Sequence, residues 1–354
     1  MSGEAMKILT SVLSSIAVLI SLPVLAHHGF VTNPVLYKAE NLVELEGELI
    51  EVFWRNPHAR ARLRVINDNG DETIWELELG PSPRGFDSRG ISPEDLIGHV
   101  KAAGHVSRRN PDSLGILHLL MPNGQEFVNG NRELRWSNVR TANASRAVDP
   151  VRVEAAERSA TSIFRVWGGN PAARGSHPPI SDYDYLMTER GRELAATYDA
   201  VTQNPELDCR QGMPTTMFDP TPMQLIDAGD RILFHGYEYD IERIIHMEPD
   251  ESGAEPQGSP LGYSVGHWEG DTLHVTTTHI DWPYFDPQGT PQSDQMRYTE
   301  TFVLSEDEWV LNYSITVTDP VNFRESFTLG RSWRWTPGRE LEPFNCVAQW
   351  EDSA

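Results

Sequence analysis

Three histidines are the residues of this sequence that most favour metal chemistry. His27 and His28 follow an apolar run, and His58 follows Asn56-Pro57 at the end of a predicted strand. If the chain is cut after Ala26, His27 contributes both its α-amine and its imidazole, and such a pair of borderline-soft nitrogen ligands suits copper. The sequence therefore predicts a copper site formed by His27, His28 and His58.

This arrangement is similar to the histidine brace of lytic polysaccharide monooxygenases, which also requires a further imidazole. A structural interpretation stays open beside it, because no HxH or HxxxH spacing accompanies these residues. In that case His28 and His58 form hydrogen bonds that close a small barrel, and His27 lies exposed.

A second candidate set lies in the C-terminal half, on predicted strands. His267 shares a strand face with Tyr263 and Val265, Arg243 shares one with apolar residues, and Glu300 interrupts an apolar and aromatic strand. If these side chains point into a barrel, they could bind an anionic or hydroxylated ligand or act as catalytic acid–base groups. They could equally form a buried ion pair or face solvent.

Residues 27–136 have the alternation of short antiparallel strands. Apolar residues and Gly alternate with acids over Val43–Leu49, and the phase changes at Ile50, which predicts a β-bulge. A hairpin turn follows at Asn67–Gly70, and acids on its return strand could face the arginines before it. Three more strands, over 100–106, 114–121 and 125–128, complete the pattern. Such spacing predicts a small antiparallel barrel of the OB type.

Residues 137–203 are expected to form a connector with short helices, at 150–160 and 188–200. The remaining residues, 204–354, are again rich in strands. We expect eight of them, over 224–226, 231–237, 239–247, 262–268, 272–278, 296–304, 309–318 and 327–335. Together they predict a mainly β chain whose C-terminal part is a larger antiparallel barrel or curled sheet, wide enough for one small ligand.

The first 26 residues have the pattern of a signal peptide. Lys7 precedes the apolar run 16–20, and Val24 and Ala26 occupy the small-residue positions of a cleavage site. An uncleaved anchor is the alternative, but it needs about 20 apolar residues. We therefore expect a periplasmic or secreted protein with no stable membrane span after cleavage.

Composition agrees with export. The chain has 354 residues and a formal net charge of −23, which argues against nucleic acid as a partner, since such proteins present a basic surface. Cys209 and Cys346 could form a disulfide in an oxidising compartment. Two buried thiols or a metal pair are the alternatives.

Several motifs carry a resemblance to a known family. The segments HHGF (27–30), VFWRNPH (52–58) and WELELG (75–80) resemble an exported bacterial family of unknown function with an "HHSF" start and a W-x-NPH motif. Gly29 replaces the usual Ser. The segments CRQGMP (209–214), GYSVGHWEGDTL (262–273) and TDP (318–320) are similar to a β-rich domain often fused to it. This resemblance implies architecture and export, and no activity.

Familiar catalytic signatures are missing from the sequence, among them the G-x-S-x-G elbow, the P-loop, the Rossmann glycines and HExxH. The sequence therefore favours an exported binding protein whose N-terminal domain holds copper while the larger barrel holds a small ligand. An exported enzyme is the alternative, with either a copper centre or acid–base groups at Arg243, His267 and Glu300.

Overall fold

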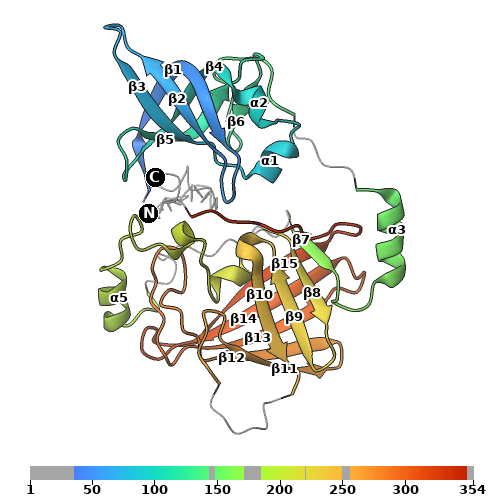
Figure 1. The fold of residues 1–354 in the computed structure, drawn as a ribbon. Helices are drawn as coiled ribbons and strands as arrows, with labels where there is room; N and C mark the ends of the chain where they lie inside the picture. Colours follow the sequence, from blue (N-terminus) through green and yellow to red (C-terminus); the bar gives the residue numbers. More distant parts are fainter. Residues whose placement is uncertain (1–35, 143–147, 171–184, 220, 249–255, 349–354) are drawn as a thin grey trace, which may run out of the picture.

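The computed structural model describes residues 36–142, 148–170, 185–219, 221–248 and 256–348. Two β-rich domains make up this part of the chain. Figure 1 shows the N-terminal domain in blue and cyan, and the larger C-terminal barrel in yellow to red. The expectation of a mainly β protein with two such domains is confirmed.

The N-terminal domain is a six-stranded sheet that curls on itself. The strand order is β3-β2-β1-β4-β5-β6, and β3 also pairs with β5 in parallel. Strands β1 to β5 therefore form a circuit, as in an OB-type barrel. Its elements are β1 (Tyr37–Phe53), β2 (Arg60–Ile66), β3 (Glu72–Glu78), α1 (Pro83–Asp87), α2 (Pro93–Leu96), β4 (Gly98–Ser107), β5 (Ser113–Leu120) and β6 (Glu126–Val128).

The predicted bulge lies in β1. The pairing of β1 with β2 shifts register between Leu49 and Glu51, which leaves Leu49 buried and Ile50 exposed. Two of the hairpin arginines lie opposite acids of the return strand in register, as expected, but one of these two pairs with a different strand. Arg62 lies opposite Glu76 of β3, but its guanidinium forms its ion pair with Glu51 of β1, at 2.8 Å. The bend of β1 brings its acids over β2, so that the arginines have partners on that side.

The C-terminal domain is a closed barrel of nine strands. Their order around the barrel is β10-β11-β12-β13-β14-β15-β7-β8-β9, and only the β10–β11 pair is parallel. The eight predicted strands are all present. The ninth, β7, comes from the predicted connector and closes the barrel between β15 and β8. The strands are β7 (Val166–Gly169), β8 (Met223–Asp227), β9 (Arg231–Gly236), β10 (Ile241–His246), β11 (Tyr263–Glu269), β12 (Thr272–Thr278), β13 (Arg297–Leu304), β14 (Val310–Thr318) and β15 (Phe327–Trp335).

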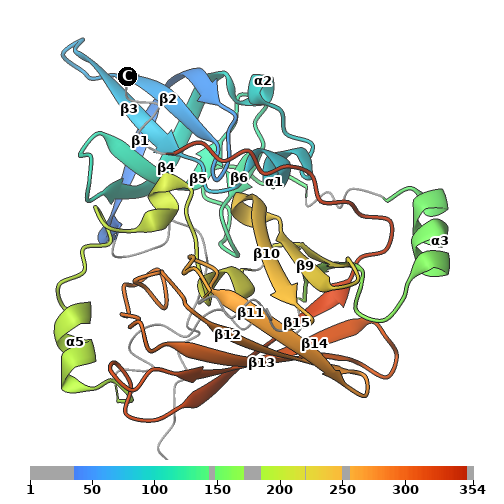
Figure 2. The same ribbon diagram turned by 60° about the horizontal axis from the view of Figure 1, so that its bottom comes forward.

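The helices are short. In Figure 2, α3 and α5 lie outside the barrel wall, whereas the 3-10 turn Thr215–Met217 is buried in the barrel core. The helix α3 begins with Asp149 as its N-cap, whose side chain accepts from the Val151 amide, and α5 is capped in the same way by Thr188. The helices described after the N-terminal domain are α3 (Pro150–Ser159), α5 (Glu189–Ala195) and the 3-10 helices η2 (Pro205–Asp208), η3 (Thr215–Met217) and η4 (Glu238–Asp240).

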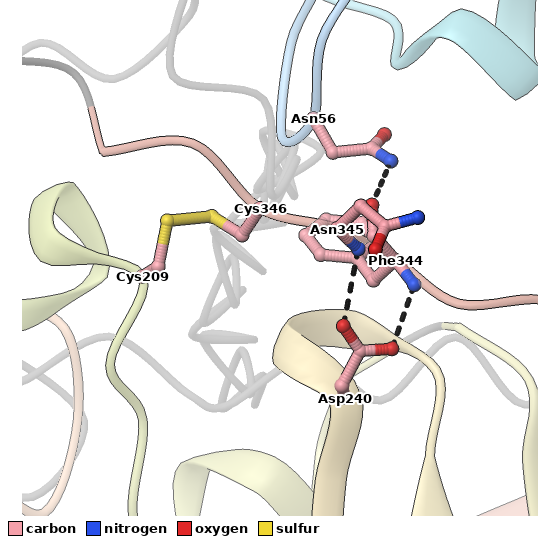
Figure 3. Close-up of a disulfide and its surroundings, with 6 residues drawn as sticks. All are labelled: Asn56, Cys209, Asp240, Phe344, Asn345 and Cys346. Carbon is pink, nitrogen blue, oxygen red and sulfur yellow. Dashed lines mark hydrogen bonds between the residues drawn. A yellow bond between two sulfur atoms is a disulfide. The ribbon is translucent and has the colours of Figure 1, made fainter. Parts of the chain in front are cut away.

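A C-terminal strap, residues 344–347, joins the two domains. Cys346 forms a disulfide with Cys209, and the Asp240 carboxylate accepts from the amides of Phe344 (2.7 Å) and Asn345 (3.0 Å). On the other side, Asn56 of the N-terminal domain donates to the Phe344 carbonyl (Figure 3). The strap runs between the domains in Figures 1 and 2. The sequence prediction of a disulfide is confirmed.

We predict that the disulfide supplies a large share of the stability. It closes a loop of 137 residues, so replacing both cysteines by serine should lower the free energy of unfolding by about 2 to 5 kcal/mol. Urea denaturation of the oxidised protein and of the double variant measures this difference. A reductant should destabilise the wild type and leave the double variant unchanged. Equal midpoints for the oxidised and reduced wild type would contradict the prediction.

Candidate functional site

The loop between β1 and β2 presents His58 at the domain interface. Asn56 precedes a cis peptide bond to Pro57, and the Asn56 carbonyl accepts from the Val347 amide at 3.0 Å. A small pocket of about 10 Å³ lies beside this loop, lined by Arg55, His58, Arg60 and Val347 among others. Both sides of the loop are therefore fixed, one by β2 and one by the strap.

His58 is held by Glu78, the last residue of β3. Its Nδ1 lies 2.6 Å from Glu78 Oε1, and the Tyr37 hydroxyl donates to Oε2 of the same carboxylate at 2.5 Å. Glu78 is only 6 % exposed. Burial alone would raise the pKa of Glu78, but the hydrogen bonds and charge of His58 and Tyr37 outweigh it, and the net pKa lies below the usual value.

The ionisation of Glu78 determines which nitrogen of the His58 ring carries the proton. An ionised carboxylate only accepts hydrogen bonds, so His58 donates from Nδ1 and a neutral ring carries its lone pair on Nε2. Burial, followed by the charge of Glu78, raises the pKa of Tyr37 well above 10, so Tyr37 stays a donor. This is the arrangement in which a histidine binds a metal through Nε2, with a carboxylate on its other nitrogen.

Three more carboxylates lie on the barrel side of the interface: Glu206, Asp219 and Glu238. Burial, and then the charges of Glu238 and Glu206, raise the pKa of Asp219 well above its usual value. Burial and the charge of Glu206 raise the pKa of Glu238 to about 8. Burial also raises the pKa of Glu206, although hydrogen bonds and the charge of His58 offset part of the shift. His58 and this carboxylate cluster are therefore electrostatic neighbours.

Polar groups around the cluster are incompletely bonded within the described chain. Gln211 is 5 % exposed, and its Nε2 reaches Glu206 at 3.4 Å while its Oε1 has no described partner. The Nε and Nη1 atoms of Arg331 are likewise buried without a partner there. A separate pocket of about 10 Å³, lined by Asp219 and Glu238 among others, is large enough for one water molecule, which would bond to those two carboxyls.

Two residues of the second predicted set, Arg243 and Glu300, meet inside the barrel. The guanidinium and carboxylate form two hydrogen bonds, of 2.6 and 2.9 Å, and both side chains are almost wholly buried. Ser264 and Thr277 also accept from Arg243, and Tyr313 donates to Glu300 at 2.9 Å. This arrangement favours a structural ion pair over a catalytic role, because the hydrogen-bonding groups of both side chains are already used within the protein.

His267 lies apart from that pair, on the outer face of β11. Its side chain is 65 % exposed and its Nε2 lies 3.2 Å from Glu269. The ring stacks on that of His274 in β12, with centroids 5.4 Å apart. The strand alternation places Ser264 and Gly266 inside the barrel and the His267 face outside.

The predicted metal ligands are only partly described. His27 and His28 lie outside the described residues, whereas His58 lies within them. No group of three or more His, Cys, Asp or Glu side chains in the described part of the chain is arranged to hold a metal.

No described helix is long and apolar enough to cross a membrane.

Sequence reasoning missed Glu78, Tyr37 and the cluster of Glu206, Asp219 and Glu238. Glu78 was expected only to face arginines across the hairpin, and it does lie opposite Arg60 in register. Its position in the WELELG motif, close after W-x-NPH, was the available signal. The cluster residues lie in turns and short helices without periodicity, and no pattern indicated them.

Comparison with known proteins identifies only the N-terminal part. Residues 16–111 match a family described as a family of unknown function, DUF6152. The match covers His27, His28, His58 and Glu78, and it ends before β5. No curated protein matches the chain.

We predict that Glu300 is structural. Glu300→Gln leaves the buried Arg243 without its counter-ion, which should cost about 3 to 5 kcal/mol in the free energy of unfolding. Urea denaturation measures the loss, and Glu269→Gln, an exposed acid of the same barrel, is the control. Replacing both partners, Arg243→Met with Glu300→Leu, should recover much of the loss. An unchanged midpoint for Glu300→Gln would argue against this role.

We also predict that stability falls as pH rises. Glu238 keeps its proton in the folded protein up to about pH 8 but loses it near 4.3 when unfolded. Between these values the folded state binds more protons, so stability is greatest below the unfolded pKa and is lost as pH rises towards 8. One proton gives a slope of up to about 1.4 kcal/mol per pH unit.

Glu238→Gln should flatten this pH dependence, because the amide carries no charge and also relieves the repulsion on Asp219. Urea denaturation at several pH values between 5 and 8 measures the slope. Glu242→Gln is the matched control, since Glu242 lies nearby on β10 with a side chain 78 % exposed. Parallel curves for the wild type and Glu238→Gln would refute the assignment.

Proposed function

We propose that this protein is an exported binding protein, periplasmic or secreted, whose ligand site lies at the domain interface around His58. The ligand we propose is copper, held by His58 together with His27 and His28 of the mature N-terminus. The observation that carries the proposal is the 2.6 Å contact between His58 and the buried Glu78. Carboxylate partners of this kind orient metal-binding imidazoles and increase their basicity.

Chain geometry is compatible with the proposed ligand set. His28 precedes Tyr37 by nine positions, and nine residues span up to about 30 Å when extended. Tyr37 donates to the same carboxylate that holds His58. The N-terminal histidines are thus within reach of His58. Imidazole and amine nitrogens are suitable ligands for copper. The bound copper would be a tightly held, redox-active ion.

Export is supported by two independent features. The N-terminal 26 residues have the pattern of a cleaved signal, and Cys209 is bonded to Cys346. Structural disulfides persist mainly in oxidising compartments. An acidic chain also suits a protein that must avoid anionic membrane surfaces.

The alternative function is an exported enzyme that uses acid–base chemistry in the C-terminal domain. The pKa of Glu238, about 8, favours this carboxyl as a proton donor near neutral pH, and the pKa of its neighbour Asp219 is raised as well. These two carboxyls replace Arg243, His267 and Glu300 as the residues to test, because the first and third bind each other and the second lies outside the barrel.

The test of copper binding begins with the N-terminal mass of the exported protein, which should correspond to a chain starting at His27. Calorimetric titration with Cu(II) should then give one site per chain. His58→Ala should weaken it at least tenfold, and Glu78→Gln about 10- to 100-fold, by loss of the orienting hydrogen bond.

The control is His99→Ala, because His99 is an exposed histidine of the same domain, paired with Glu46 on its surface. It should bind copper like the wild type. A mature chain that starts elsewhere, or equal copper affinity for His58→Ala and wild type, would refute the copper site. Thermal melting of each variant checks that the fold is intact.

A further inference from the structure

A cleft lies at the end of the barrel that faces away from the N-terminal domain. The β9–β10 connection, with Asp240, faces that domain, whereas the β8–β9 turn and the β11–β12 hairpin lie at the opposite end. These segments appear at the bottom of Figure 1. The cleft has a volume of about 420 Å³, within the range of small-molecule sites. Its lining includes Phe164, Asp227, Ile232, Met247, Trp268 and Asp271.

Apolar and aromatic side chains form much of this cleft. Trp268 and Phe164 meet edge to face, with ring centroids 6.2 Å apart at 75°. Trp268 remains 37 % exposed, although β11 continues past it to Glu269. Ile232 is buried beneath, and Met247 is partly buried. An exposed indole with apolar neighbours offers a flat π-face to a ligand.

The charged residues that line the cleft are both acidic. Asp227 and Asp271 are exposed, and none of the described lining residues is basic. Two nearby arginines are already paired: Arg231 contacts Asp230 at 2.9 Å, and Arg165, whose side chain is 3 % exposed, bonds to Glu308. The cleft therefore combines an aromatic face with carboxylates that have no basic partner among its described lining residues, which favours a cation and disfavours an anion.

We propose that this cleft binds a small organic ammonium ion, with the cationic group over the Trp268 ring and the carboxylates of Asp227 and Asp271 beside it. An ammonium ion satisfies both features at once, because the indole attracts it through cation–π interaction and the carboxylates neutralise its charge. This site is distinct from the proposed copper site and uses the exposed hairpin of the GYSVGHWEGDTL segment.

Calorimetric titration of the full chain with choline tests the site. Its uncharged carbon isostere, dimethylbutanol, has the same shape and serves as the matched ligand. Choline should bind at one site, and the isostere at least about tenfold more weakly, since it lacks the cation–π and carboxylate attraction. Trp268→Ala should abolish choline binding, while Trp268→Phe should retain part of it.

Two aspartate variants complete the design. Asp271→Asn should weaken choline binding several-fold, whereas Asp294→Asn should not, although it removes the same charge. Asp294 is exposed at the opposite end of the barrel, just before β13. The proposal is overturned if choline does not bind, if choline and dimethylbutanol bind equally, or if Trp268→Ala binds choline like the wild type while melting at the same temperature.

Discussion

The attachment of the C-terminal strap to both domains is the constraint on which the interface depends. Cys346 is bonded to Cys209, and Asp240 accepts two strap amides, so the strap belongs to the barrel. Asn56 bonds to the strap from the other side, through both its amide and its carbonyl. Because His58 follows Asn56 by two positions, the same contacts that join the domains also position the imidazole. Site geometry and domain attachment therefore cannot be separated.

The carboxyl groups at this interface have pKa values shifted in opposite directions. Burial raises the pKa of each one, but the surroundings differ. Glu78 accepts from Tyr37 and contacts His58, and these interactions outweigh burial. Asp219 and Glu238 face other carboxylates, which add to the effect of burial. At neutral pH the interface thus combines an ionised carboxylate that orients a histidine with at least one carboxyl, that of Glu238, which keeps its proton. The groups that contact a buried acid, more than the extent of its burial, determine whether it is ionised or protonated.

Much of the fold could be predicted from the sequence because strand side chains alternate with a period of two. This period indicated the strands and the bulge after Leu49. It could not indicate β7, whose four residues include two glycines, or tell which strand face points inward. That ambiguity is why His267 was grouped with Arg243 and Glu300. The interaction of Glu78 with Tyr37 joins residues 41 positions apart, and the pairing of β3 with β5, which closes the sheet, brings them together.

The filled interior of the barrel separates its two ends. Arg243, Glu300 and their hydroxyl partners occupy the centre, and large buried rings such as Trp167 and Trp333 fill the space beside them. No ligand can pass through such packing. One strand, β9, nevertheless touches both ends: Ile232 lines the outer cleft, while Phe234 and Gly236 line the pocket of Asp219 and Glu238. A hydrogen-bonded strand between two neighbours is stiff, so any coupling of the two sites requires β9 to move as a unit.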